Sequence, residues 1–165
     1  MSNWFTNLFR KRKPVQASSF QDRFRRINRI AILYPLEIEY ARIARYTLQR
    51  LYQSEEPFQF LMVHSSERAE MVAGLPYAVL AFDPLLKKEH RAELSEGLAA
   101  FRADLLLQLE PDPPEVLSAL IAQADIPLKM GFGEEQEGLN LTFANKENAF
   151  YEKSILNLIQ LLMKK

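Results

Sequence analysis

The chain has 165 residues, of which 48% are hydrophobic and 25% are charged, as in a soluble globular protein of one domain. Cysteine is absent, which excludes disulfides, thiolate nucleophiles and cysteine-type zinc sites. No apolar run approaches the roughly 18 residues that a spanning helix needs, and no secretory signal begins the chain, so we expect a cytoplasmic protein.

The formal net charge of zero conceals an uneven distribution along the chain. Between Met1 and Arg29, eight basic residues stand against the single acid Asp22, so the rest of the chain is net negative. A basic arm on an acidic body is typical of an arm that contacts another molecule.

Residues 1–14 form this basic arm, and within it residues 2–13 are predicted to be a short amphipathic helix that ends at Pro14. Its apolar face and the basic cluster after it comprise Trp4, Phe5, Leu8, Phe9, Arg10, Lys11, Arg12 and Lys13. Such an arm suits an anionic membrane surface, here the inner face of a bacterial membrane, and a protein partner or a second copy of the chain is the alternative. Nucleic acid is disfavoured because the body has no further basic stripe.

Residues 15–28 are expected to comprise a linker followed by a short helix at residues 19–26. A single domain is expected from residue 29 to residue 165. In that domain, apolar runs alternate with segments of helical spacing. Strands are expected within residues 29–35, 57–64, 77–82, 101–110 and 126–132, with a short extra edge strand at 139–143. Helices are expected within residues 36–52, 65–71, 87–100, 115–124 and 146–164.

This alternation predicts an α/β fold with a doubly wound, Rossmann-like and mostly parallel sheet. Right-handed crossovers give five strands the order 3-2-1-4-5, with helices on both faces. Ligands of such sheets bind beyond the carboxyl ends of the strands where the order reverses, which here is at the loops after the first and fourth strands.

Neither of these two loops contains a glycine that would let backbone N–H groups cradle a phosphate. Both contain proline and acidic residues, and the acidic set, which we call the rim, comprises Glu37, Glu39, Glu110, Asp112 and Glu115. We expect the two loops to lie side by side and their carboxylates to repel the phosphates of a nucleotide, so no cofactor is predicted.

Paired acids can also act as general acid and base or hold a divalent cation. We favour ordinary helix starts, because Glu37, Glu39 and Glu115 fall in first helical turns. His64 is expected as a polar strand end and His90 as a solvated helix residue, so no metal site is predicted. The two glycines at 131 and 133 are expected to form a tight turn after the fifth strand.

The segment ADLLLQLEPDPPEVLSALIAQADIPLKMGFG (103–133) resembles the amino-terminal half of the heptosyltransferase-like glycosyltransferases of bacterial lipopolysaccharide synthesis. The resemblance runs by pattern from about Arg29 to Phe143. The tail LTFANKENAFYEKSILNLIQLL (141–162) also resembles small bacterial proteins that keep this half alone. It implies the acceptor-side domain of an enzyme in which a second Rossmann-like domain binds the sugar nucleotide.

Two departures from the family bear on activity. The family has a Gly-Asp pair just after the first strand, and its aspartate is regarded as the catalytic base. Here Glu39 and Tyr40 align with the pair, so the pair is missing. Glu39 is the single, weak catalytic candidate, and it could replace the aspartate only if the helix were shifted by one residue. The donor-binding domain is expected to be missing, which leaves half of the cleft unable to position a reaction.

Three functions remain open. The first is a non-catalytic accessory protein, held at the membrane by its basic arm and acting through protein contacts. The second is the acceptor-side half of a glycosyltransferase that a separate donor-binding chain completes. The third is a subunit of a larger membrane-bound assembly or a homo-oligomer.

Overall fold

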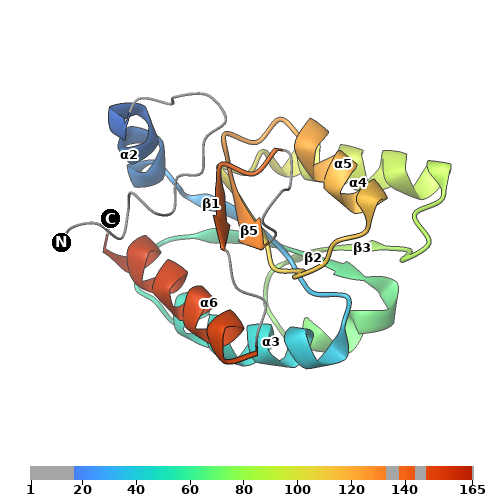
Figure 1. The fold of residues 1–165 in the computed structure, drawn as a ribbon, viewed down its shortest axis with the longest axis horizontal. Coiled ribbons are helices and arrows are strands. Elements are labelled where there is room, and N and C mark those ends of the chain that lie inside the picture. Colours follow the sequence, from blue (N-terminus) through green and yellow to red (C-terminus); the bar gives the residue numbers. More distant parts are fainter. Residues whose placement is uncertain (1–16, 133–137, 144–147, 165) are drawn as a thin grey trace.

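A computed structural model of the chain describes residues 17–132, 138–143 and 148–164. Their strands form one sheet of six strands in the order β3-β2-β1-β4-β5-β6 (Figure 1). The strands are β1 (Arg29–Leu33), β2 (Gln59–Ser65), β3 (Ala78–Phe82), β4 (Leu105–Gln108), β5 (Leu128–Phe132) and β6 (Leu141–Phe143). All neighbouring strands are parallel, as expected.

The expected number of five strands is wrong. β6 is a full sixth strand that pairs with β5 through Met130, Gly131 and Phe132. Asn140, just before β6, positions this strand beside β5. Its N–H donates to Lys129 O at 2.7 Å, and its Oδ1 accepts from Lys129 N–H at 2.8 Å. β6 has three residues and lies within residues 139–143, where the sequence indicated a short extra edge strand.

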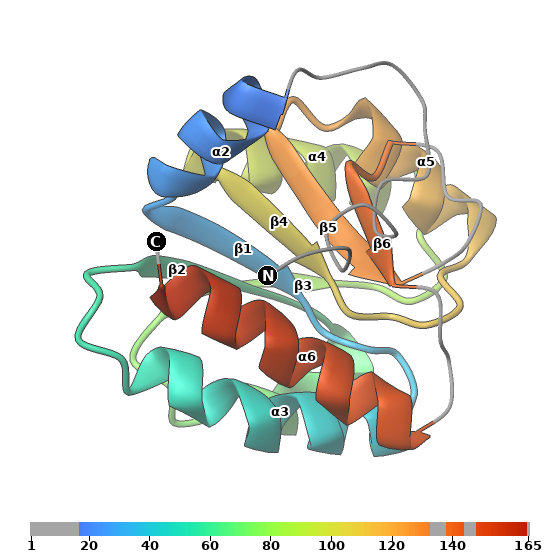
Figure 2. The ribbon, with the colours of Figure 1, turned by 60° about the vertical axis from the view of Figure 1, so that its left-hand side comes forward.

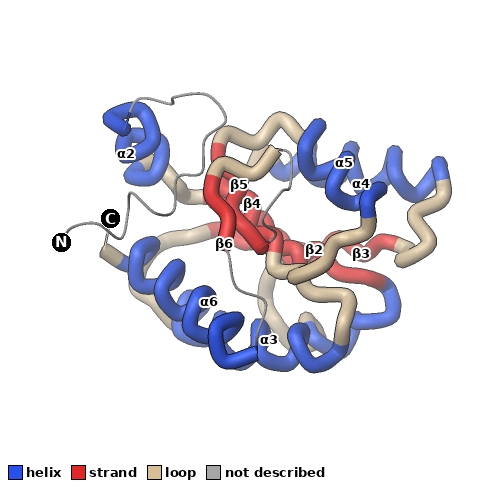
Figure 3. The backbone as a smooth tube through the Cα atoms, in the orientation of Figure 1, coloured by secondary structure: helices blue, strands red, loops and turns tan. Residues whose placement is uncertain are grey.

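Helices cover both faces of the sheet, as the alternation of apolar runs predicts. They are α2 (Ala17–Arg25), α3 (Ile38–Tyr52), α4 (Lys88–Phe101), α5 (Glu115–Gln123) and α6 (Asn148–Met163). Figure 2 shows α3 and α6 together on one face and α4 and α5 on the other. A 3₁₀ helix, η1 (Ser66–Met71), follows β2 and is capped by Ser65 Oγ, which accepts from Glu67 N–H at 3.2 Å. The tube drawing separates the strands from these helices and from the loops (Figure 3).

The sheet divides the core into two apolar layers. Residues that point to α3 and α6 include Ile32, Met62 and Leu107, all fully buried. The alternate residues Leu33, Val63 and Leu106 point to α4 and α5. Strands with apolar residues on both faces explain the near-continuous apolar runs in the sequence.

Two expectations about single residues are wrong. Gly131 lies inside β5 and not in a turn, and a Cβ at this position would lie 2.4 Å from Gln108 O. The glycine is therefore needed for the close approach of β4 and β5. His90 is half-buried and not solvated, and its Nδ1 has no hydrogen-bond partner within the described part of the chain.

Some predicted features fall outside the described residues. These are the arm of residues 1–14, which includes Trp4 and Lys13, and the second glycine of the expected turn, Gly133. Among the helices that are described, none has the length and apolar character needed to cross a membrane.

Candidate functional site

The loops that follow β1 and β4 meet at the carboxyl ends of the strands. Leu109 N–H donates to Leu33 O at 3.1 Å, which continues the ladder between the two strands. Beyond it, Leu36 N–H donates to Glu110 Oε2 at 2.6 Å. The two loops therefore lie side by side at the point where the strand order reverses.

Glu110 is a buried part of the fold and not an exposed member of the rim. Its side chain is 5% exposed. Oε2 accepts from Leu36 N–H and Oε1 accepts from Asp112 N–H at 3.1 Å. Because both oxygens accept backbone hydrogen bonds, the carboxylate joins the two loops and is not available to a ligand.

The same loop is held from its other side by an arginine of η1. Arg68 Nε donates to Leu36 O at 2.7 Å, and Arg68 Nη1 donates to Glu67 O at 2.9 Å. Leu36 thus uses both its N–H and its C=O to join β1 to the elements after β4 and β2. No pattern around Arg68 in the sequence indicates this role.

The other four acids of the rim are exposed, namely Glu37, Glu39, Asp112 and Glu115. Glu37 is the N-cap of α3, but its side chain makes no capping hydrogen bond. Glu39 lies in the first turn of α3 and Glu115 in the first turn of α5, where the helix dipole favours negative charge. These positions agree with ordinary helix starts.

Burial and four acids of the rim raise the pKa of one side chain, Tyr40. Its pKa is raised first by burial and then by the negative charges around it, which are those of Glu37, Glu110, Glu39 and Asp112. The ring of Tyr40 packs on Tyr151 with centroids 4.8 Å apart, and Tyr151 OH donates to Leu109 O at 2.7 Å. A phosphate brought to this edge would meet a negative potential.

Gln108 is a buried polar residue that the sequence reasoning missed. It ends β4, is fully buried, and donates from Nε2 to Glu110 O at 2.8 Å. Its Oε1 has no hydrogen-bond partner among the residues that the structure describes. A single polar residue within the apolar run LLLQL was the available signal.

Within residues 17–132, 138–143 and 148–164, no three metal-ligating side chains gather. His64 is buried near the end of β2, where its Nδ1 lies 2.7 Å from Ser65 O.

Two hollows lie away from the rim. One is an apolar void of about 10 Å³ between the sheet and α4 and α5, lined in part by Leu33, Leu94 and Leu117. The other is a shallow groove of about 280 Å³ on α3 and η1, lined by Arg42, Arg45, Tyr46, Gln49 and Met71. Neither hollow includes an acid of the rim.

Comparison with known proteins shows that solved structures share the fold of this chain. No protein-family model and no curated protein sequence matches the chain. Among solved structures, E. coli heptosyltransferase WaaC with ADP-2-deoxy-2-fluoro heptose superposes with a TM-score of 0.62 at 14% identity. That match covers 82% of this chain and 48% of WaaC, and WaaC with ADP gives a TM-score of 0.60, 14% identity and coverage of 79% and 46%.

The fold is therefore that of a half-length, heptosyltransferase-like protein, and the resemblance of the sequence to such enzymes is confirmed at the level of fold. The chain spans about half the length of the solved structures that it matches. At this identity, the likeness carries over the architecture and no activity.

Proposed function

We propose that this protein is a non-catalytic accessory protein that associates with the cytoplasmic face of a bacterial membrane and uses a glycosyltransferase-like half-fold to dock a protein partner. The observation that carries the proposal is the closed, acidic rim. Sheets of this kind bind phosphorylated ligands at the loops after β1 and β4. Here Glu110 joins these two loops through backbone hydrogen bonds, and exposed carboxylates surround them.

The chemistry of the loop after β1 supports the absence of nucleotide binding. Phosphate sites of this kind offer free backbone N–H groups at a helix N-terminus. In this loop Pro35 has no N–H, and Leu36 N–H already donates to Glu110. Glu37 and Glu39 then add negative charge at the start of α3.

Calorimetric titration with ADP and with ADP-sugars tests the proposal, because the matched WaaC structures contain such ligands. We expect no saturable binding at millimolar concentration. The matched variant Glu37→Gln/Glu39→Gln removes two exposed charges and leaves Glu110 intact. Saturable binding by the unaltered chain that weakens in Glu39→Ala would reject the proposal.

The second candidate is the acceptor-side half of a glycosyltransferase completed by a separate donor-binding chain. Its supporting observation is the match to about half of WaaC. Affinity purification from bacterial extract would then recover a glycosyltransferase-like partner. The mixture would transfer sugar, and Glu39→Ala would abolish that transfer.

The proposed membrane association depends on the basic arm of residues 1–14. The contact of this arm with an anionic membrane or a protein stays a prediction. Flotation with anionic vesicles compares the chain with a variant that carries glutamine at positions 10–13. A loss of flotation supports the membrane, and unchanged flotation removes the arm from the proposal. Crosslinking in membranes followed by pulldown tests the remaining candidate, a subunit of a larger assembly.

A further inference from the structure

α2 is fixed to the sheet at the amino ends of the strands, the edge opposite the rim. Arg23 Nη1 lies 3.5 Å from Pro127 O, just before β5, and Ile27 after the helix is buried. Phe24 packs partly buried against the apolar layer beneath α3 and α6. The backbone N–H groups of Asn28 and Arg29 both donate to Asp104 Oδ2 at 2.9 Å, which fixes the entry into β1.

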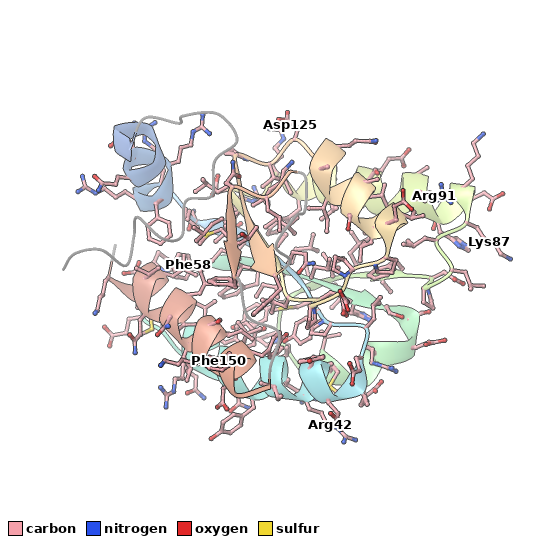
Figure 4. All side chains as sticks on the ribbon, viewed as in Figure 1. Arg42, Phe58, Lys87, Arg91, Asp125 and Phe150 are labelled. Carbon is pink, nitrogen blue, oxygen red and sulfur yellow. The ribbon has the colours of Figure 1, made fainter. Side chains whose placement is uncertain are left out.

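The exposed surface of α2 and its final turn is basic. Arg23, Arg25 and Arg26 are exposed, and Asp22 lies beside them in the sequence. Two other acids lie at the same edge of the sheet, namely Asp104, which accepts from Asn28 and Arg29 N–H, and exposed Glu55 before β2. Exposed Lys164 directly follows α6, and the C-terminal end of the chain lies on the same side of the molecule as α2 (Figure 1). The exposed acid Asp125, before β5, lies farther along this edge (Figure 4).

The rim has the opposite charge and lies at the opposite end of the same strands. Its exposed residues are Glu37, Glu39, Asp112 and Glu115. Because every strand is parallel, all amino ends share one edge and all carboxyl ends share the other. The basic cluster of α2 and the acidic rim therefore lie at opposite ends of the strands.

We propose that α2 is a docking surface for anionic lipid headgroups, and that it holds the amino edge of the sheet on the membrane with the rim facing away. The inference rests on the proposed membrane association and adds the orientation. A planar anionic surface attracts the three arginines and repels the rim, so one orientation is favoured. A nucleic acid would need a longer basic track than this short helix offers.

A flotation experiment with the full chain tests α2. The variant Arg23→Gln/Arg25→Gln/Arg26→Gln removes three charges. Glutamine has about the same helix propensity as arginine, so α2 should be retained. The matched control Arg42→Gln/Lys87→Gln/Lys88→Gln removes the same charge from exposed positions; Arg42 and Lys87 project far from α2 in Figure 4. On vesicles containing phosphatidylserine, we expect the α2 variant to lose roughly 100-fold in partition coefficient, since each basic residue near the surface contributes about fivefold.

A polarity-sensitive dye tests the orientation, because the chain has no cysteine and can be labelled at one introduced site. Gln21→Cys places the dye on α2, and Ser66→Cys places it beyond the carboxyl end of β2; both residues are exposed. We expect a blue shift on anionic vesicles at position 21 and none at position 66.

The outcomes separate this inference from the proposed function. Vesicle binding that the α2 and control variants weaken equally, or a blue shift at position 66 alone, rejects the orientation and leaves the membrane association in place. No binding of the unaltered chain to anionic vesicles rejects both. Binding to duplex DNA in the absence of vesicle binding would assign the arginines to nucleic acid and also reject the inference.

Discussion

Replacing Glu110 with alanine should destabilise the fold much more than replacing any exposed acid of the rim. The substitution leaves the N–H groups of Leu36 and Asp112 without their acceptor. A hydrogen bond to a charged group contributes about 1.5–3 kcal/mol. Both donors are only partly buried, so water replaces part of the loss, and we expect a cost of about 3 kcal/mol.

Urea unfolding followed by circular dichroism measures this cost. With a denaturant slope of about 2 kcal/mol/M, the midpoint should fall by about 1.5 M. Hydrogen exchange gives a local readout, because the Leu36 amide should lose its protection in the variant. Glu39→Ala is the control, since an exposed acid outside any described hydrogen bond should change stability by about 0.5 kcal/mol or less.

The reasoning fails if Glu110→Ala unfolds at the same urea concentration as the unaltered chain. It also fails if the Leu36 amide keeps its protection. Either result would mean that the carboxylate does not join the two loops in solution. Glu110 would then return to the set of acids available to a ligand, and the closed rim would lose its main support.

Three other substitutions test separate parts of the fold. Gly131→Ala should cost about 2–3 kcal/mol, because the new Cβ would meet the backbone of Gln108 at 2.4 Å. In the matched change Gly97→Ala, the atoms in the way are the terminal carbons of Leu80, which can move, so we expect a change within about 1 kcal/mol; equal effects of the two would refute the packing of β4 on β5. Tyr34→Phe removes the 2.8 Å hydrogen bond between the hydroxyls of Tyr34 and Tyr52 and should cost about 1 kcal/mol near neutral pH. Burial raises the pKa of Tyr34 from 10.0 to about 12, so the unfolded chain ionises first and stability falls as the pH rises from about 10 to about 12. Unfolding at a series of alkaline pH values should show a smaller decline in Tyr34→Phe, and an identical decline would contradict the burial of this hydroxyl. Tyr151→Phe should remove the bond to Leu109 O and lower the melting temperature by a few degrees, as scanning calorimetry can measure, with no loss expected for exposed Tyr46→Phe.

The sequence predicted the architecture well because its apolar runs are strong signals. RIAIL, QFLMVHS and LKMGF are buried on both faces, so they stand out from the helical segments between them. Proline and acidic residues after β1 and β4 also indicated the position of the rim. The count of five strands was wrong because the segment at 139–143 was expected only as a short extra edge strand, whereas pairing with β5 and the contacts of Asn140 make β6 a full member of the sheet.

The chemistry within the rim could not be predicted in the same way. Glu110 follows a strand and precedes Pro111, a position where acids are normally solvated. In the fold it is buried, and its carboxylate accepts hydrogen bonds from two backbone N–H groups. Arg68 reaches Leu36 across 32 positions of the chain, and no local pattern encodes that contact. Gly131 resembles a turn glycine until its distance from Gln108 is known.

The length of the strands has a consequence for the way the protein would meet a charged surface. β1 has five residues, so α2 and the rim are separated by about 17 Å or more. At physiological ionic strength the Debye length is about 8 Å, so mobile ions screen either end of the sheet from the other. In its last few ångströms, an approaching surface would interact with the charges around α2 and not with the rim. In dilute salt, the charges at both ends of the strands would orient the protein before contact.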